Sequence, residues 1–78
     1  MIYFVQKEVI DMDRQFDMDL GLVESAIRDA GYVVYDQLYG FWLTGNSAYI
    51  TRKNGARTVA ENLDRELLGQ YLKLRKAS

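Results

Sequence analysis

The sequence from Gly31 to Arg57 reads GYVVYDQLYGFWLTGNSAYITRKNGAR, in which an aromatic-rich segment precedes a segment of turn-forming residues. Apolar side chains of residues 33–44 recur at helical spacing and cover most of the circumference of that helix. They are Val34, Leu38, Phe41 and Trp42 on one face, with Tyr35, Tyr39 and Leu43 beside it. A helix that is apolar nearly all round lies at the centre of a fold or under another subunit. We therefore predict a central helix over residues 33–44.

A turn-rich connector, Gly45 to Gly55, follows this helix. Gly45 and Asn46 have the chemistry that ends a helix in a turn. Tyr49 and Ile50 are large apolar residues within a mostly polar stretch. We expect both side chains to fold back onto the core, so that the connector is an anchored loop.

Towards the N-terminus, a helix with one apolar face is predicted over residues 13–30. Its apolar positions recur at i, i+4, i+7, i+11 and i+14, which is the pattern of an amphipathic helix. They are Phe16, Leu20, Val23, Ile27 and Ala30. Gly31 follows and is free to take the left-handed conformation that ends a helix.

Towards the C-terminus, one continuous helix is predicted over residues 55–76. Its apolar positions recur at i, i+4, i+8, i+12 and i+15. They are Val59, Leu63, Leu67, Tyr71 and Leu74. Asn54 is the predicted N-cap, and Thr58 with Glu61 forms a competing capping box one turn later.

Residues 1–10 read MIYFVQKEVI and are rich in β-branched and aromatic side chains, which favours an extended segment. A single strand must pair with the edge of another strand, for example that of a symmetry mate. A frayed arm at the N-terminus is the alternative.

The predicted architecture is all-α, with residues 1–78 as a single domain. Residues 1–12 form the extended arm, and residues 13–76 form a core of three main helices and a short helical turn.

The size of the chain favours a homodimer. A domain of 78 residues buries only about two-thirds of its unfolded surface and is marginally stable alone. The absence of Cys and His excludes disulfides and the commonest transition-metal ligands, so oligomerisation remains the way to bury more apolar surface.

No segment approaches the roughly 20 apolar residues of a membrane span. The apolar residues at the start of the chain are not preceded by the basic residues of a secretory signal peptide. We expect a cytoplasmic protein.

No catalytic, metal or cofactor site is predicted. An EF-hand loop beginning at Asp11 would need Gly at its sixth position and Glu at its twelfth, where Phe16 and Leu22 stand. The acidic residues there suit the start of a helix better. The glycines are too dispersed for a phosphate-binding loop. We therefore expect a protein that is not an enzyme.

The charges divide the chain into two halves. Residues 1–36 hold eight acids against three bases, and residues 37–78 hold seven bases against three acids. A basic cluster lies at the end of the connector and the start of the last helix, where cations oppose the helix dipole. It indicates recognition of an acidic group, a phosphate or the acidic half of another subunit. The predicted partner-binding residues are Arg52, Lys53, Arg57 and Arg65. Solubility and local ion pairs, such as Arg57 with Glu61, are the simpler explanation.

A small nucleic-acid-binding regulator that uses this basic cluster is the alternative function. Acidic residues dilute the basic half, which disfavours a nucleic-acid surface. No basic residue lies between Arg28 and Arg52, so the aromatic side chains lack the cations that accompany base stacking. Packing in the core or in a dimer interface explains the aromatic side chains better. The residues assigned to that role are Tyr35, Leu38, Tyr39, Phe41, Trp42 and Tyr49.

Several motifs in the chain resemble the IreB (also ReoM) family of small bacterial regulatory phosphoproteins. Family members carry Gly-Tyr after a helix, then Gln and Gly within the next helix. A Gly-Asp-Pro-Ala-Tyr-Ile-Pro-Arg connector, Asn-x-Ala-Arg and a final helix ending in Tyr-Leu follow. The matching residues are Gly31-Tyr32, Gln37, Gly40, Gly45-Asn46-Ser47-Ala48-Tyr49-Ile50-Thr51-Arg52, Asn54-Gly55-Ala56-Arg57, Asp64-Arg65-Glu66 and Tyr71-Leu72. The resemblance covers about residues 22–72.

The resemblance implies an all-helical homodimer that works by contact with another regulatory protein or a protease adaptor. Family members are phosphorylated on N-terminal threonines by PASTA-domain Ser/Thr kinases of Gram-positive bacteria. They regulate cell-wall synthesis and β-lactam tolerance through Clp-dependent turnover of an early peptidoglycan enzyme. Arginines of the last helix matter in the family, and Arg57 and Arg65 match that pattern.

The chain departs from the family pattern in three places. Ser47 and Thr51 replace the two connector prolines, and Asn46 replaces the acid. Glu61 and Asn62 stand where relatives carry basic residues. Residues 1–24 contain no Ser or Thr, so any phosphate must be carried elsewhere. The candidate phosphorylation sites are Thr44, Ser47, Thr51 and Thr58.

Overall fold

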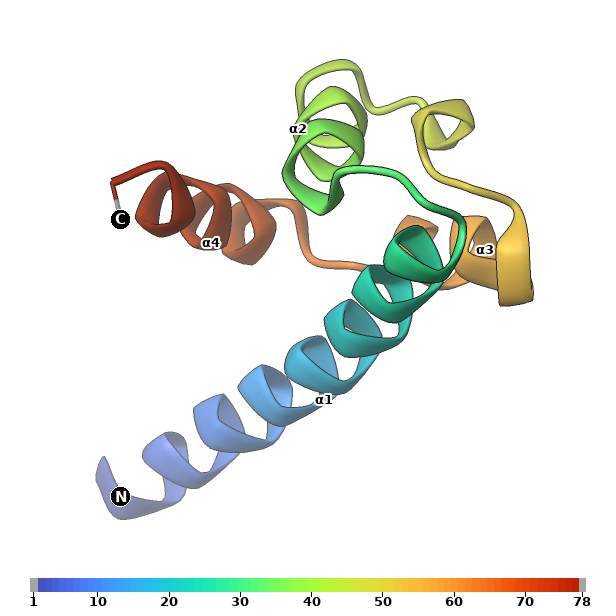
Figure 1. Cartoon of the computed structure of the whole chain (residues 1–78). Coiled ribbons are helices and arrows are strands. Elements are labelled where there is room, and N and C mark those ends of the chain that lie inside the picture. The colour runs from blue at the N-terminus through green and yellow to red at the C-terminus, as the bar shows by residue number, and fades with distance from the viewer. Residues whose placement is uncertain (1, 78) are drawn as a thin grey trace.

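The computed structural model describes the backbone of residues 2–77 and the side chains of residues 14–76. The described elements are all helical, which confirms the all-α class (Figure 1). They are α1 (Ile2–Asp29), α2 (Val34–Thr44), the 3₁₀ turns η1 (Ser47–Tyr49) and η2 (Lys53–Gly55), α3 (Ala56–Glu61) and α4 (Arg65–Ala77). None of the helices in this described part has both the length and the apolar composition needed to cross a bilayer.

The first helix is longer than predicted. Since α1 begins at Ile2 and runs to Asp29, the extended arm predicted over residues 1–12 is wrong over residues 2–12, and Met1 lies outside the described residues. Strand preferences are weak and depend on context, whereas adding turns to an existing helix is easier than starting one. The predicted end is confirmed, because Gly31 has a φ of 86° and the Tyr32 amide donates to the Ile27 carbonyl at 3.1 Å.

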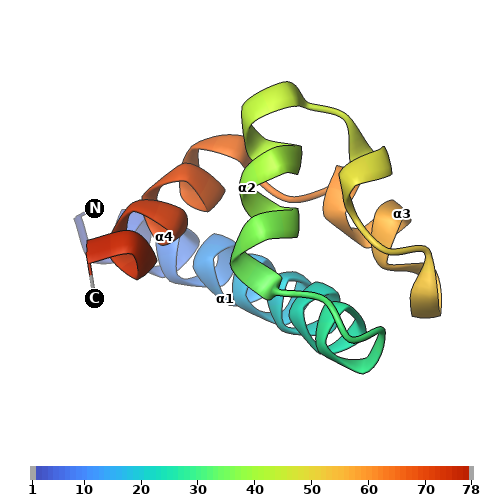
Figure 2. The same ribbon diagram turned by 45° about the horizontal axis from the view of Figure 1, so that its top comes forward.

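The second helix follows the prediction closely. α2 spans Val34–Thr44, and Gly45 ends it in the left-handed conformation with a φ of 74°. In both views, α2 lies between α4 on one side and η1 with α3 on the other, and α1 runs below them (Figures 1 and 2). α2 therefore has neighbours on several sides, as its nearly continuous apolar surface requires.

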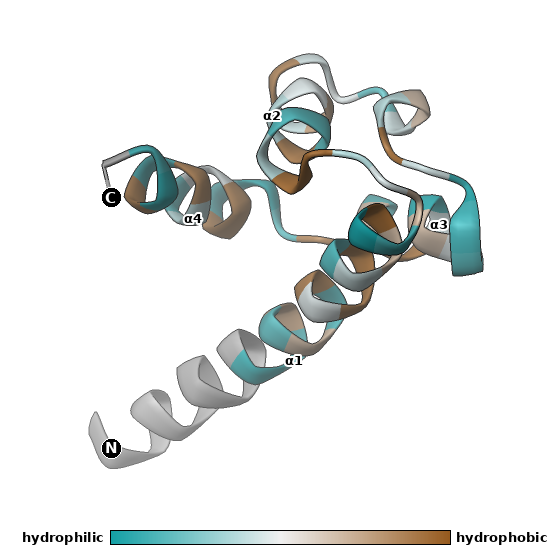
Figure 3. Cartoon of the chain, viewed as in Figure 1, coloured by the Kyte–Doolittle hydropathy of each residue, from teal (hydrophilic) through white to brown (hydrophobic). Residues whose placement is uncertain are grey.

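The hydrophobic core collects side chains from every α-helix and from the connector. Its buried members are Leu20, Val23, Ala26, Ile27, Val34, Leu38, Ile50, Ala56, Ala60, Leu63, Leu68 and Leu72. Partly buried side chains packed against them are Phe16, Tyr35, Phe41, Trp42, Val59 and Tyr71. Apolar and polar residues alternate along the described part of α1 and along α4, as expected for helices with one buried face (Figure 3).

The connector folds back onto the core through Ile50, as expected, but Tyr49 does not join the core. Ile50 is 1% exposed, whereas Tyr49 remains 49% exposed. The Tyr49 ring nevertheless lies against α2 at Gly40, where an added Cβ would come within 2.6 Å of Tyr49 Cδ1. A side chain at position 40 would displace the ring, so glycine is needed there for close packing.

The long C-terminal helix predicted over residues 55–76 is wrong, because the chain breaks between α3 and α4. Leu63 lies in the break and is buried, and its amide donates to the Ala60 carbonyl at 3.0 Å. Asp64 then caps α4, with its Oδ1 accepting from the Leu67 amide at 2.9 Å. Apolar periodicity continues across residues 62–64 because Leu63 is buried in either arrangement, so the pattern alone does not reveal the break.

The predicted caps of the C-terminal region also differ from the structure. Asn54 does not cap α3, since it lies inside η2 with a φ of 55°. Gly55 occupies the N-cap position without a side-chain hydrogen bond. The capping box of Thr58 with Glu61 does not form, because Thr58 lies inside α3 and Glu61 accepts from the Ser47 hydroxyl at 2.9 Å.

Replacing the cap of α4 tests the break directly. We expect Asp64→Ala to lower the free energy of unfolding by about 1 kcal/mol, because the Leu67 amide loses its acceptor. Asp64→Ser should retain most of the stability. Urea unfolding followed by tryptophan fluorescence gives both values. A continuous helix through position 64 would instead be stabilised by alanine, the best helix former, and that result would contradict the break.

Candidate functional site

The four predicted partner-binding residues do not form one surface. Arg52 and Arg57 line a polar pocket of about 270 Å³ at the connector. Arg65 lines a separate groove of about 560 Å³ between α2 and α4, and Lys53 lines neither cavity. The charge cluster seen along the sequence is therefore divided between two places.

Arg57 holds the connector in place. Its Nε donates to the Ile50 carbonyl at 2.7 Å, and its Nη2 donates to the Ala48 carbonyl at 3.2 Å. Gln37 of α2 completes this attachment by accepting the Thr51 amide at 2.8 Å. Two of the five N–H donors of the Arg57 guanidinium are thus used inside the molecule. The expected Arg57–Glu61 pair is absent from the described side chains, among which Arg75 with Glu24 forms the only ion pair.

The remaining two basic residues of the connector differ in their contacts. Lys53 is exposed, and its Nζ donates to the Asp29 carbonyl at the end of α1, at 3.2 Å. A cation suits the carbonyl end of a helix. Arg52 is exposed and makes no side-chain hydrogen bond or ion pair with the described residues. Arg52 is thus the residue of this pocket whose charge is open to a partner.

The groove between α2 and α4 has an aromatic floor. The rings of Tyr35 and Tyr39 are stacked, with centroids 5.7 Å apart and an interplanar angle of 9°. Trp42 continues the row, with its ring centroid 6.2 Å from that of Tyr39. Trp42 Nε1 donates to the Arg65 carbonyl at 3.1 Å. An added Cβ at Gly69 would come within 2.9 Å of Trp42 Nε1, so the glycine makes room for the indole.

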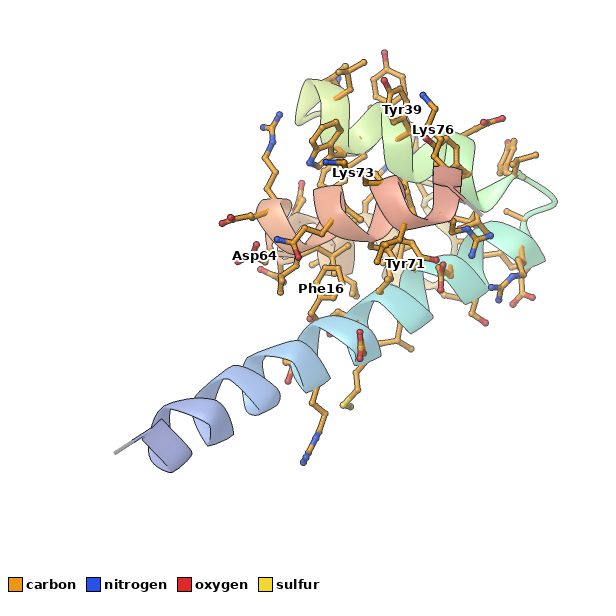
Figure 4. All side chains as sticks on the ribbon, turned by 90° about the vertical axis from the view of Figure 1, so that its left-hand side faces the viewer. Phe16, Tyr39, Asp64, Tyr71, Lys73 and Lys76 are labelled. Carbon is orange, nitrogen blue, oxygen red and sulfur yellow. The ribbon has the colours of Figure 1, made fainter. Side chains whose placement is uncertain are left out.

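Charged side chains border this groove. Its basic members are Arg65, Lys73 and Lys76, and its acidic member is Glu66. Figure 4 shows Lys73 and Lys76 on the side of α4 that faces α2, with Tyr71 on the side that faces α1. The groove therefore combines an apolar floor with a border that carries an excess of positive charge.

The six residues assigned to core or dimer interface occupy three environments. Leu38 is completely buried in the core, and Phe41 packs against the core. Tyr35, Tyr39 and Trp42 line the groove, while Tyr49 covers Gly40 on the connector side. Other large apolar side chains are exposed elsewhere, and they are Met18, Leu22, Tyr32, Val33, Leu43 and Leu74.

A polar network joins α1 to α4 on the opposite side of α4 from the groove. The Tyr71 hydroxyl donates to Glu24 and accepts from Arg75 Nη1 at 3.0 Å. Burial and the neighbouring Glu24 carboxylate raise the pKa of Tyr71 above its ordinary value, because both disfavour the phenolate. The sequence carries no signal for this network, since the two helices are brought together only by the fold.

The candidate phosphorylation sites differ in the contacts of their hydroxyl groups. Thr44 donates to the Gly40 carbonyl at 2.7 Å, and Ser47 donates to the Glu61 carboxylate. Thr51 accepts from the Lys53 amide at 3.3 Å. Thr58 is exposed on α3, and its hydroxyl bonds to none of the described residues. A phosphate on Ser47 would face a like charge, whereas one on Thr58 would lie near a helix N-terminus.

The described carboxylates do not gather into a site. Among residues 14–76, no group of three or more acidic side chains is placed to hold a metal ion. Asp17 and Asp19 lie on α1, and Gln15 donates to Asp19 at 3.0 Å. The side chains of Asp11 and Asp13 lie outside the described residues.

The chain belongs to the IreB regulatory phosphoprotein family, whose sequence pattern it matches over residues 2–74. The match covers nearly the whole chain, including the connector, α2 and α4 as far as residue 74. Membership confirms the resemblance seen in the motifs and identifies a small regulatory protein.

The role of Arg57 is testable against its neighbour Arg52. We expect Arg57→Ala to lower the free energy of unfolding by about 1–3 kcal/mol, because two carbonyls of the folded connector lose a charged donor. Arg52→Ala removes an exposed side chain and should change stability by less than about 0.5 kcal/mol. Urea unfolding of both variants makes the comparison. Equal effects would show that Arg57 does not hold the connector.

Proposed function

We propose that this protein is a non-enzymatic regulator of cell-wall synthesis and β-lactam tolerance that acts in the cytoplasm through contact with other proteins. Membership of a regulatory phosphoprotein family carries the proposal. An exposed Arg52 in the connector and a cationic aromatic groove on the other side of α2 supply surfaces for such contacts. Aromatic side chains and arginines are enriched where protein partners bind.

The proposed partners are a second copy of the chain and another regulatory protein or protease adaptor. Exposed apolar side chains support the dimer, since Met18 and Leu22 are each 61% exposed on α1. Scattered exposed apolar residues are common, but a small domain gains stability by covering several of them at once. Light scattering should then give a mass near twice the 9.0 kDa of one chain.

The proposed upstream signal is phosphorylation by a PASTA-type Ser/Thr kinase at a site outside residues 1–24. We expect the kinase domain to add one phosphate to Thr58, whose exposed hydroxyl makes no competing bond with the described residues. Intact-mass analysis followed by peptide mapping measures the modification. Thr58→Ala should abolish it, and Ser47→Ala should not.

Two results would count against the proposal. If a typical family member is phosphorylated in parallel and this chain is not, the kinase input is absent. If loss of the protein changes neither β-lactam tolerance nor the amount of the early peptidoglycan enzyme, the cell-wall role is wrong. Complementation with the wild-type chain and with Thr58→Ala separates these two conclusions.

A further inference from the structure

We propose that the groove between α2 and α4 binds an acidic segment of a partner protein, anchored by one aromatic or large aliphatic side chain. This inference rests on the proposed function, because it names the kind of partner through which a small regulator would act. It concerns a surface separate from the connector pocket that holds Arg52 and Arg57.

The floor of the groove is fixed before any partner arrives. Trp42 is held by its hydrogen bond to the Arg65 carbonyl and by close packing at Gly69. Tyr39 stacks on Tyr35 yet stays 41% exposed, so its ring remains available for contact. A surface whose side chains are already ordered loses little entropy on binding. Aromatic residues in such a setting commonly dominate the affinity of an interface.

The border of the groove determines the charge of the partner. Lys73, Lys76 and Arg65 carry three positive charges against the single carboxylate of Glu66. None of these cations forms an ion pair with the described residues, where the one pair is Arg75 with Glu24 on the α1 side of α4. Unpaired charges around an apolar floor complement a segment that carries acidic residues on both sides of an apolar one.

The dimensions of the groove suit a single anchoring side chain on a short segment. Its volume of about 560 Å³ lies within the range of pockets that enclose a compact ligand. α4 has 13 residues and is therefore about 20 Å long, which matches a few turns of a bound helix or a short extended segment. Helices that place one apolar face in a groove are a common mode of peptide recognition.

A selection from random peptides tests the proposal, because it requires no identified partner. Phage-displayed random dodecapeptides are selected on the full chain and on the double variant Lys73→Glu/Lys76→Glu. The control is Arg14→Glu/Arg28→Glu, which reverses two exposed charges on α1 away from the groove. Enriched peptides are then synthesised and titrated, with Trp42, the only tryptophan of the chain, as the fluorescent reporter in the groove.

We expect the enriched peptides to combine acidic residues with an aromatic or large aliphatic residue and to change Trp42 fluorescence. Their affinity should fall at least about tenfold in the Lys73→Glu/Lys76→Glu variant, because like charges then face each other. The control variant should bind as the wild type does. Tyr39→Ser should also weaken binding, which separates the contribution of the floor from that of the charges.

Two outcomes would overturn the proposal. The first is enrichment of no peptide, or of peptides that bind the groove variant and the control equally well. The second is that selection fails while Lys73→Glu/Lys76→Glu lowers the mass measured by light scattering, since a second copy then covers the groove. Neither outcome affects the kinase and complementation experiments, so a failure of this inference is distinguishable from a failure of the proposed function.

Discussion

The attachment of the connector to α2 and α3 is the constraint on which the rest of the structure depends. The Arg57 guanidinium binds the carbonyls of Ala48 and Ile50, and Gln37 accepts the Thr51 amide. A connector folded onto the core needs such partners, because backbone polar groups removed from water are costly when unpaired. These bonds allow Ile50 to be 1% exposed in the hydrophobic core.

Fixing the connector on one side of α2 leaves the other side to α4. The chain turns at Asp64, which caps α4, and α4 then packs against α2. Gly69 of α4 lets the indole of Trp42 approach closely. The same turn divides the basic residues, since Arg57 serves the fold whereas Lys73 and Lys76 border an apolar groove. The path of the chain thus separates structural cations from those available to a partner.

Sequence patterns predict the features that depend on local chemistry. The central helix and its end at Gly45 follow from apolar spacing and from the freedom of glycine, and the structure confirms both. The break at Leu63 is not predicted, because a buried leucine fits a continuous helix equally well. The division of the basic cluster is also hidden, since the carbonyls that bind Arg57 become its neighbours only after folding. The sequence also does not predict that Gly69 makes room for the Trp42 indole, because the two residues lie on different helices and meet only after folding.

Amide hydrogen exchange at the connector tests the central claim most directly. The Thr51 amide donates to Gln37, whereas the adjacent Arg52 amide has no acceptor among the described residues. If the connector is held as we describe, the Thr51 amide exchanges on the order of a hundredfold more slowly than an unstructured amide, and the Arg52 amide exchanges rapidly. Equal and rapid exchange at both positions would show that the connector is a loose loop and would contradict the account.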